Sequence, residues 1–224
     1  MANRECGQRR LRPAGVAGRV IRICRVIGIA SPLAAVAAVI VAGALTPGYD
    51  AMSRTVSRLA VPGVWAAAVV DVSISLIALT CFALALTLGP NVLAGRVALT
   101  VSGVALGGAA MVHLDPGSAG ATAVHRLFSA IAVLGLTAAP LTLARVYGSL
   151  SLVVGIGELG MLVIGLALLA TPFDAWGAWE RVLLAIPLAW MVLLSASLRP
   201  TAAMIPSTEE IISASTAILS RSGS

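Results

Sequence analysis

The sequence predicts an all-α integral membrane protein, a six-transmembrane-helix bundle with both termini in the cytoplasm. Hydrophobic residues make up 59% of the 224 residues and charged residues only 11%, whereas soluble domains carry about 25% charge. Six long apolar runs follow one another with short polar breaks between them. Most arginines lie at one end of these runs, as the positive-inside rule describes for cytoplasmic segments.

Each apolar run approaches or exceeds the length that a helix needs to cross a bilayer. Backbone groups in lipid must be hydrogen-bonded within their own segment, so each run should be helical. Gly103 and Gly107 are four residues apart and predict a close approach of helices within the bundle. The predicted spans are residues 26–45, 64–88, 97–112, 123–143, 150–170 and 180–198.

The two predicted tails, residues 1–25 and 199–224, flank the spans. Residues 1–25 carry seven of the fifteen arginines, and the chain has no lysine. This placement predicts a cytoplasmic tail that contacts anionic lipid, not a nucleic-acid-binding segment. With that end inside, the inner segments hold eleven arginines and the outer loops four. In the second tail, Ser207 and Glu210 form a capping-box pattern, which predicts a short amphipathic helix; a frayed polar tail is the alternative.

The segment from Pro47 to Gly63 is the longest polar interruption between two apolar runs. Two further polar loops follow the third and fifth predicted spans. Because odd-numbered spans end on the same side of the membrane, the three loops could meet at one outward-facing site. Their polar residues are Tyr49, Asp50, Ser53, Arg54, Ser57 and Arg58, then His113, Asp115, His125 and Arg126, then Asp174, Glu180 and Arg181.

We expect a non-enzymatic protein that binds a lipid headgroup or a partner subunit at this outward-facing site. Membrane lipids and a membrane-protein partner are the expected partners, and neither nucleic acid nor a cofactor is expected. In the simpler interpretation, the loop arginines pair with Asp50, Asp115, Asp174 and Glu180 and pin the loops together. The predicted binding residues are Tyr49, Asp50, Arg54, Arg58, Arg126 and Arg181.

Two enzymatic alternatives use the same loops. A hydrolase would take Ser57 or Ser53 as nucleophile, His125 as base and Asp115 as the group that orients the base. A metal-dependent lipid enzyme would take His113, His125 and Asp115 as ligands, with Asp50 as a further one. The chain contains no GxSxG, HExxH or HxxxH motif. Charge pairing at the membrane interface is therefore favoured over catalysis or metal binding.

Two acidic residues, Asp71 and Glu158, fall inside predicted spans. A lone carboxylate in hydrocarbon is costly, so each should face the bundle interior, be protonated or have a partner. One interpretation is a small proton-coupled carrier that uses both acids. The alternative is a pair of protonated acids that hydrogen-bond to serines across helices, with Ser73, Ser75 and Ser102 as candidates.

The stretch Pro47-Gly48-Tyr49-Asp50 is followed by Thr55-Val56-Ser57-Arg58-Leu59. With these two motifs the chain resembles a bacterial six-span membrane family that is abundant in actinobacteria and catalogued as domain of unknown function 998. The chain departs from the family at Arg58, where glutamate is more frequent. The resemblance covers most of residues 26–198 and implies a six-helix bundle in a bacterial plasma membrane, without an activity. Weaker matches follow in the family's order at Asp115-Pro116, His125, Glu180-Arg181 and Trp190.

Overall fold

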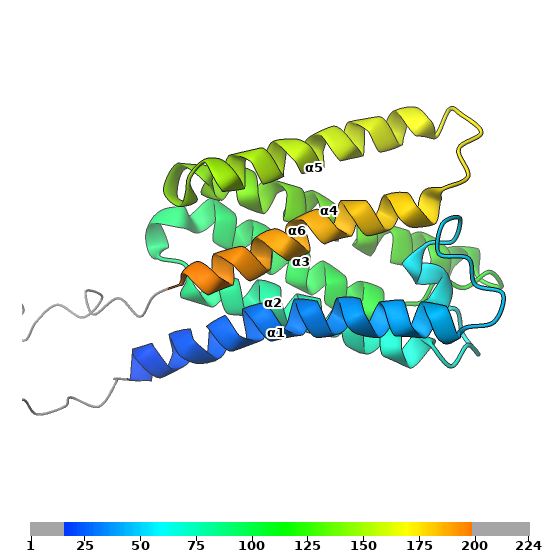
Figure 1. The fold of residues 1–224 in the computed structure, drawn as a ribbon, viewed down its shortest axis with the longest axis horizontal. Helices are drawn as coiled ribbons and strands as arrows, with labels where there is room; N and C mark the ends of the chain where they lie inside the picture. The colour runs from blue at the N-terminus through cyan, green and yellow to red at the C-terminus, as the bar shows by residue number, and fades with distance from the viewer. Residues whose placement is uncertain (1–15, 199–224) are drawn as a thin grey trace, which may run out of the picture. The chain divides into compact units, whose positions relative to one another are not determined.

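The computed structural model describes residues 16–198, which form six α-helices and two short 3-10 helices without a strand (Figure 1). The short helices are η1 (Val56–Ala60), between α1 and α2, and η2 (Pro90–Val92), before α3. The predicted tail up to residue 15 and the predicted helix at Ser207 and Glu210 lie outside the described residues. The α-helices are α1 (Val16–Leu45), α2 (Ala67–Thr87), α3 (Leu93–Met111), α4 (Ala119–Tyr147), α5 (Ser149–Leu168) and α6 (Trp176–Ser197).

The six α-helices of the described chain are long and apolar enough to cross a membrane. Large apolar side chains point away from the bundle on every helix; Leu86 is 71% exposed and Leu166 is 69% exposed. In water so much exposed apolar surface would promote aggregation, whereas lipid acyl chains solvate it. The helices hydrogen-bond their own backbone groups, as a lipid environment requires. The predicted all-α membrane fold is confirmed, and the chain is a multi-pass helical membrane protein.

Five of the six α-helices begin earlier than the hydropathy pattern predicts, and α1, α3, α4 and α6 do so by four residues or more. α1 begins at Val16 and not at residue 26, so Arg19, Arg22 and Arg25 lie on its first turns and not in an unstructured tail. α3 begins at Leu93 because the η2 turn leads directly into it. The Ser118 side chain accepts a hydrogen bond from the Ala121 amide at 3.2 Å and thereby caps the start of α4. Polar or charged residues in the first turns lower the local hydropathy, so a prediction from hydropathy places these helix starts too late.

Glycines set the spacing of the central helices. A Cβ atom at Gly103 of α3 would overlap the ring of Phe82 on α2, and one at Gly108 would overlap Phe128 on α4. Gly107 meets nothing within 4 Å, so it is not part of a close contact. The predicted Gly103 and Gly107 pair is therefore wrong: Gly103 and Gly108 serve two different helix interfaces.

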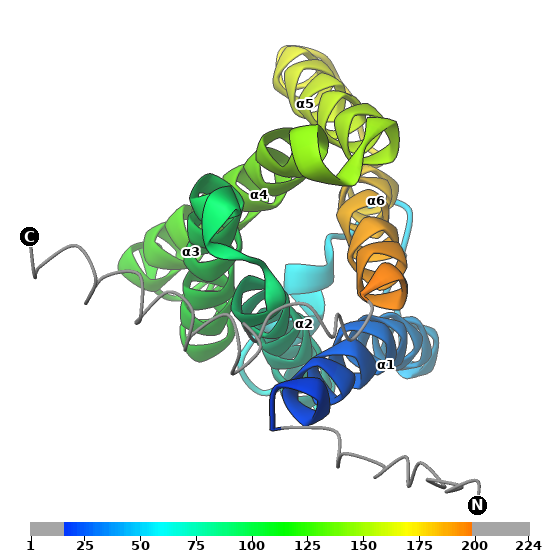
Figure 2. The ribbon, with the colours of Figure 1, turned by 90° about the vertical axis from the view of Figure 1, so that its left-hand side faces the viewer.

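Residues Ile23–Leu198 form one compact unit, in which α3 packs between α2 and α4, and α4 also contacts α5 and α6 (Figure 2). α1 lies against α6, since a Cβ atom at Gly28 would overlap the Ser195 side chain. The loops that join α1 to α2, α3 to α4 and α5 to α6 all lie at the same end (Figure 1). We call this end, which contains η1, the η1 end.

Candidate functional site

The Pro-Gly-Tyr-Asp stretch forms a compact turn after α1. Gly48 has a φ of 70°, in the left-handed region that glycine adopts without strain. The Asp50 carboxylate then closes the next turn: Oδ2 accepts from the Ser53 hydroxyl at 2.6 Å and Oδ1 from the Met52 amide at 3.0 Å. The Ser53 hydroxyl, and after it the Met52 amide, hold the pKa of Asp50 below its usual range. The carboxylate oxygens of Asp50 are thus used within the loop itself.

Tyr49 and Arg181 join this loop to α6. Arg181 Nη2 donates to the Tyr49 hydroxyl at 2.5 Å, and that hydroxyl faces the carbonyl oxygens of Arg54 and Thr55, each 3.0 Å away. Arg181 Nη1 donates to the carbonyl oxygen of Ala51 at 2.7 Å. The guanidinium carbon lies 5.6 Å from the centroid of the Tyr49 ring, within the range of a cation–π contact. Arg181 therefore satisfies loop carbonyl groups and does not pair with an acid.

The first turn of α6 packs directly on the loop. The Ala178 amide donates to the carbonyl oxygen of Met52 at 2.9 Å. The Val56 amide, at the start of η1, donates to Glu180 Oε2. Gly177 lies so close to the loop that a Cβ atom there would overlap loop carbonyl oxygens. The loop and the start of α6 therefore form one interlocked structure, which we call the loop–α6 platform (residues 47–60 and 176–181).

A buried apolar cluster supports the platform from the membrane side. Leu59 of η1 is completely buried and packs with Val70 of α2, while Tyr49 and Val56 are packed against the same cluster. Burial of one leucine side chain contributes roughly 1.5–3 kcal/mol, enough to hold a short 3-10 helix that would not persist alone. The cluster consists of Ala42, Leu59, Ala60, Ala66 and Val70.

An open cavity of about 930 Å³ lies between the platform and the start of α4. Its walls come from the loop between α1 and α2, the loop before α4, the first turns of α4 and the first turn of α6. The three polar loops that the topology allowed to converge therefore do converge. The chemically active lining residues are Arg54, Ser57, Arg58, His125, Arg126 and Glu180.

Arg54, Arg58 and Arg126 present exposed guanidinium groups to this cavity. Within residues 16–198 no carboxylate lies within 4.0 Å of them; the close contact of a basic and an acidic side chain described there is that of His113 and Asp71. The predicted pairing of the loop arginines with the loop acids is therefore wrong. The physical reason is local: backbone amides and hydroxyl groups closer in the fold already occupy the carboxylates of Asp50, Asp115 and Glu180.

His125 is 4% exposed and is held by backbone carbonyl oxygens. Its Nδ1 lies 2.7 Å from the carbonyl oxygen of Val112 and 3.2 Å from that of Ala109, so Nδ1 carries a proton and donates it. Nε2 has no partner among the described residues and is not fully buried. In the neutral ring Nε2 is then an acceptor. Ser57 lines the same cavity, with its Oγ 3.5 Å from Thr55 Oγ1.

Asp115 does not orient His125. Its Oδ1 accepts from the Gly117 amide at 2.8 Å, and its carbonyl oxygen accepts from the Thr122 hydroxyl at 2.7 Å. The carboxylate therefore closes the turn before α4 and is not part of the cavity lining. The predicted arrangement of Ser57, His125 and Asp115 is not assembled, because the turn amides are nearer to Asp115 than the imidazole is.

The predicted metal ligands also lie apart. His113 Nε2 is 2.8 Å from Asp71 Oδ2, whereas His125 is bound to carbonyl oxygens and Asp115 to its own turn. Within residues 16–198 no three His, Cys, Asp or Glu side chains come close enough to hold a metal ion. The metal site predicted from His113, His125 and Asp115 is therefore not formed.

The two intramembrane acids have different surroundings. Asp71 contacts His113, and not the predicted serines, since Ser73 and Ser102 donate to carbonyl oxygens of their own helices. Glu158 is 1% exposed, and neither of its carboxyl oxygens has a partner within the described chain. The pair of acids predicted to act together is thus one residue in contact with a histidine and one isolated residue.

Glu180 and Gly177 have structural roles that the sequence pattern did not predict. Glu180 was expected only as a charge partner, yet it binds the η1 amide and lines the cavity. The one available signal was the weak family match at Glu180-Arg181.

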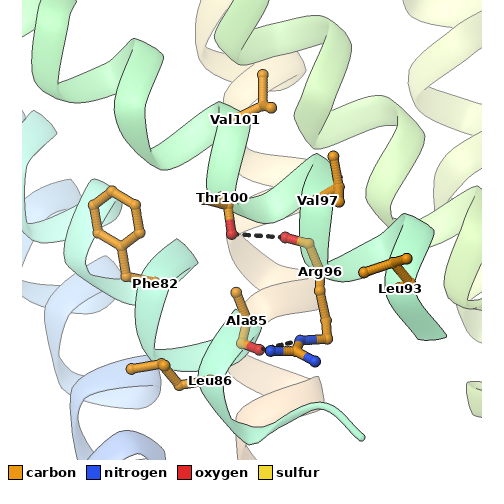
Figure 3. A pocket seen from close by; sticks show the side chains of 8 residues that line it. All are labelled: Phe82, Ala85, Leu86, Leu93, Arg96, Val97, Thr100 and Val101. Carbon is orange, nitrogen blue, oxygen red and sulfur yellow. Dashed lines mark hydrogen bonds between the residues drawn. The ribbon is translucent and has the colours of Figure 1, made fainter. Parts of the chain in front are cut away.

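A second hollow of about 440 Å³ lies between the end of α2 and the start of α3 (Figure 3). Its one charged residue, Arg96, donates from Nε to the carbonyl oxygen of Ala85 at 3.1 Å and so caps the last turn of α2. The remaining lining is mostly apolar, and Leu86 and Leu93 are exposed. The charged group of this hollow therefore already has a structural partner, and the rest of its lining offers no further charged side chain.

Comparison with protein families gives a match over residues 29–197 to the family described as "Protein of unknown function (DUF998)". Searches of curated proteins and of solved structures give no match. The matched region spans all three polar loops and ends within α6. The resemblance carried by the Pro-Gly-Tyr-Asp loop is thereby confirmed, and the chain belongs to the DUF998 family.

Proposed function

We propose that the cavity at the η1 end binds the phosphate-bearing headgroup of an anionic membrane lipid. The observation that carries this proposal is the placement of Arg54, Arg58 and Arg126 around one open cavity without a carboxylate partner. Guanidinium groups form paired hydrogen bonds with phosphate oxygens and are the usual residues for phosphate recognition. A lipid phosphate would supply the negative charge that these three arginines do not find in the described part of the protein.

The remaining lining fits a lipid better than a free ion. Val61, Val64, Leu114 and Trp176 contribute apolar surface to the same cavity. An indole ring at the level of lipid headgroups is typical of membrane interfaces. A headgroup could therefore meet the arginines while its glycerol and upper acyl carbons contact the apolar wall.

Glu180 does not cancel the positive charge of the cavity. Its carboxylate accepts a hydrogen bond from the Val56 amide, so it is committed to the loop–α6 platform. Three arginines against one such carboxylate leave an excess of positive charge. This excess favours an anionic ligand over a zwitterionic one of the same size.

The test uses the full chain in nanodiscs that contain equal amounts of phosphatidylglycerol and phosphatidylcholine. The double variant Arg54→Ala, Arg126→Ala should retain several-fold less phosphatidylglycerol after detergent extraction, measured by native mass spectrometry. The control Arg25→Ala, Arg145→Ala removes the same charge from exposed arginines outside the cavity. Equal retention in both double variants would contradict the proposal, and loss of a co-purifying protein in place of lipid would identify a partner subunit as the ligand.

The proposal places the η1 end at the outer face of a bacterial plasma membrane. The arginine distribution supports this orientation, since the opposite end and its flanking segments hold the larger number. In a chain without its three cysteines, Met52→Cys should react with a membrane-impermeant maleimide on intact cells, because Met52 is 60% exposed. Asn91→Cys, at the other end, should react only after permeabilisation; the reverse pattern would overturn the orientation.

A second candidate function is hydrolysis of a bound lipid ester. The specific observation in its favour is that His125 Nδ1 donates to carbonyl oxygens while Nε2 is left as a potential base in the cavity that Ser57 also lines. Purified protein would be incubated with phosphatidylglycerol, and released fatty acid or phosphate measured. Activity that is lost in both Ser57→Ala and His125→Gln would support hydrolysis, whereas binding without turnover would leave headgroup binding as the function.

A further inference from the structure

We propose that Glu158 is the centre of an intramembrane binding site for a monovalent cation, either a proton or Na⁺. Glu158 lies at the middle of α5 and is 1% exposed, with both carboxyl oxygens buried and without a partner in the described chain. An ionised carboxylate in this position is strongly disfavoured unless a positive charge joins it. The side chain does not line the cavity at the η1 end, so this proposal stands or falls independently of headgroup binding.

α5 packs against α4 and α6 (Figure 2). Glu158 belongs to the buried stripe of α5, which consists of Ser151, Gly155, Glu158 and Gly165. At one end of the stripe, Trp190 Nε1 of α6 donates to Ser151 Oγ at 3.0 Å. Toward the other end, a Cβ atom at Gly165 would contact the indole of Trp179. Glu158 is midway between Ser151 and Gly165, so its level on the antiparallel α6 is between residues 184 and 185.

A second contact fixes the level of Glu158 on α4. A Cβ atom at Gly155 would overlap the Leu141 side chain. Glu158 follows Gly155 by three residues. Because α4 runs antiparallel to α5, the level of Glu158 on α4 is three residues before Leu141, at residue 138. Glu158 therefore lies beside the middle of both helices, between α4 and α6, which also contact each other.

Both neighbouring helices carry a buried proline close to this level. Pro140 lies inside α4 and Pro187 inside α6. Proline has no N–H group, so the carbonyl oxygens of Leu136 and Leu183, four residues earlier, lack their usual helix donor. No side chain within the described residues donates to either carbonyl. Each is within about two residues, or about 3 Å along the helix axis, of the level of Glu158.

The Glu158 carboxylate and the carbonyl oxygens of Leu136 and Leu183, which lack the proline N–H donor, would together supply an all-oxygen set with a single negative charge. Such a set suits a proton, which the carboxyl would hold and share with a carbonyl, or Na⁺, which oxygen ligands would surround. A divalent cation would leave one positive charge unbalanced in hydrocarbon, and an anion would meet only negative or partly negative atoms. Carbonyl oxygens freed within transmembrane helices are a recurrent feature of ion sites in transporters.

No other charged group within the three packed helices faces this level. Glu158 is the one charged residue of α5, and the titratable residues of its neighbours lie toward their ends. The charge of the bound cation would therefore be balanced by Glu158 itself. The residues at the ends are His125 and Arg126 at the start of α4, Arg145 and Tyr147 at its end, and Glu180 and Arg181 at the start of α6.

Infrared difference spectroscopy on the full chain in nanodiscs tests this site. The protonated carboxyl of Glu158 should give a C=O stretching band in wild type that is absent from Glu158→Gln and retained in the control Asp71→Asn. That band should disappear on titration between about pH 5 and about pH 10 if the ligand is a proton. It should disappear at fixed pH when choline chloride is replaced by sodium chloride if Na⁺ competes for the carboxylate. A Glu158 band insensitive to both pH and Na⁺, or no Glu158 band under any condition, overturns the proposal.

The carbonyl ligands have their own test. Pro140→Ala and Pro187→Ala each restore an N–H donor to a freed carbonyl and should weaken cation binding. The band should then be lost at a pH lower by roughly one unit, or the required Na⁺ concentration should rise about tenfold. The matched control is Pro32→Ala, which changes a buried proline in α1, away from the stripe. Unchanged midpoints in both proline variants would show that the carbonyl groups are not ligands.

Discussion

Arg181 Nη2 donates a hydrogen bond to the Tyr49 hydroxyl across 2.5 Å, although 132 positions separate the two residues. This contact ties Tyr49, in the loop after α1, to Arg181 near the start of α6. The Arg181 guanidinium also donates to the loop carbonyl oxygens of Ala51 and Arg54. The characteristic tyrosine of the Pro-Gly-Tyr-Asp stretch is thus a tertiary anchor.

Removing the Tyr49 hydroxyl should destabilise the folded protein. Tyr49→Phe keeps the ring but deletes the acceptor for Arg181, and hydrogen bonds to charged groups contribute about 1.5–3 kcal/mol. Arg181→Lys should cost at least as much, because an ammonium cannot bridge the hydroxyl and several carbonyl groups at once. Thermal unfolding in detergent, followed by tryptophan fluorescence, measures both. Arg58→Ala, which removes a guanidinium without a described partner, is the control, and an equal loss in all three variants would contradict the anchor.

Gly177→Ala should disrupt the packing of the start of α6 on the loop. The new Cβ atom would overlap the loop carbonyl oxygens of Ala51 and Arg54, which hydrogen bonds from the Arg181 guanidinium hold in place, so the platform must shift. We expect a loss of roughly 1–3 kcal/mol in unfolding free energy and reduced lipid retention. The matched control is Gly120→Ala near the start of α4, where an added Cβ meets nothing within 4 Å. Similar effects of the two substitutions would show that the loop does not pack on α6 in this way.

Tyr49 should ionise at higher pH than a tyrosine in water. Burial raises the pKa of its phenol above the usual value of about 10, and the hydrogen bond from Arg181 opposes this only in part. Because the folded state then binds the proton more tightly than the unfolded state, this contribution to stability is complete below about pH 10. It is lost as pH rises through the folded pKa.

The chain has only two tyrosines, so the titration can be resolved. In a Tyr147→Phe background, the tyrosinate absorbance should report Tyr49 alone, with its midpoint above about pH 10. Urea-denatured protein supplies the reference midpoint in the same optical cell. A folded midpoint at or below that of the denatured chain would mean that the Tyr49 hydroxyl is exposed.

The His113 and Asp71 side chains should be energetically coupled. Their contacting atoms are 2.8 Å apart, and both side chains are about one-third exposed or less. Single substitutions His113→Gln and Asp71→Asn, with the double variant, form a thermodynamic cycle. We expect a coupling energy of about 1 kcal/mol from thermal or chemical unfolding. Asp71→Asn combined with Arg145→Ala should be additive, because no contact joins those residues. Additivity in both cycles would contradict the contact between His113 and Asp71.

The number, type and order of the helices could be predicted from apolar run length alone. A run of that length offers few alternatives in lipid, since only a helix satisfies its own backbone. Helix starts were less predictable. Arg19, Arg22 and Arg25 lower the local hydropathy, although they lie on α1, where long side chains can reach the membrane interface. Hydropathy predicts which part of a helix lies in the hydrocarbon core of the bilayer, and it does not predict the residue at which the helix begins.

The composition of the site was predicted better than its contacts. Arg54, Arg58, Arg126, Ser57 and His125 do line one cavity, because alternating spans return to the same end. Their partners could not be predicted, since the choice between an acid, an amide and a carbonyl depends on distances of a few ångströms. Asp115 and Asp50 bond to their own turns, where the competing donors are adjacent in the chain.

The apolar runs therefore determined the membrane fold by themselves, because lipid penalises every unpaired backbone group and leaves a helix as the structure for each run. Tertiary packing alone decided that Tyr49 meets Arg181, that His113 meets Asp71 and that Glu158 meets no partner. These outcomes depend on the relative level and rotation of packed helices. Close contacts such as that of Gly155 with Leu141 set that geometry, and apolar periodicity does not encode it.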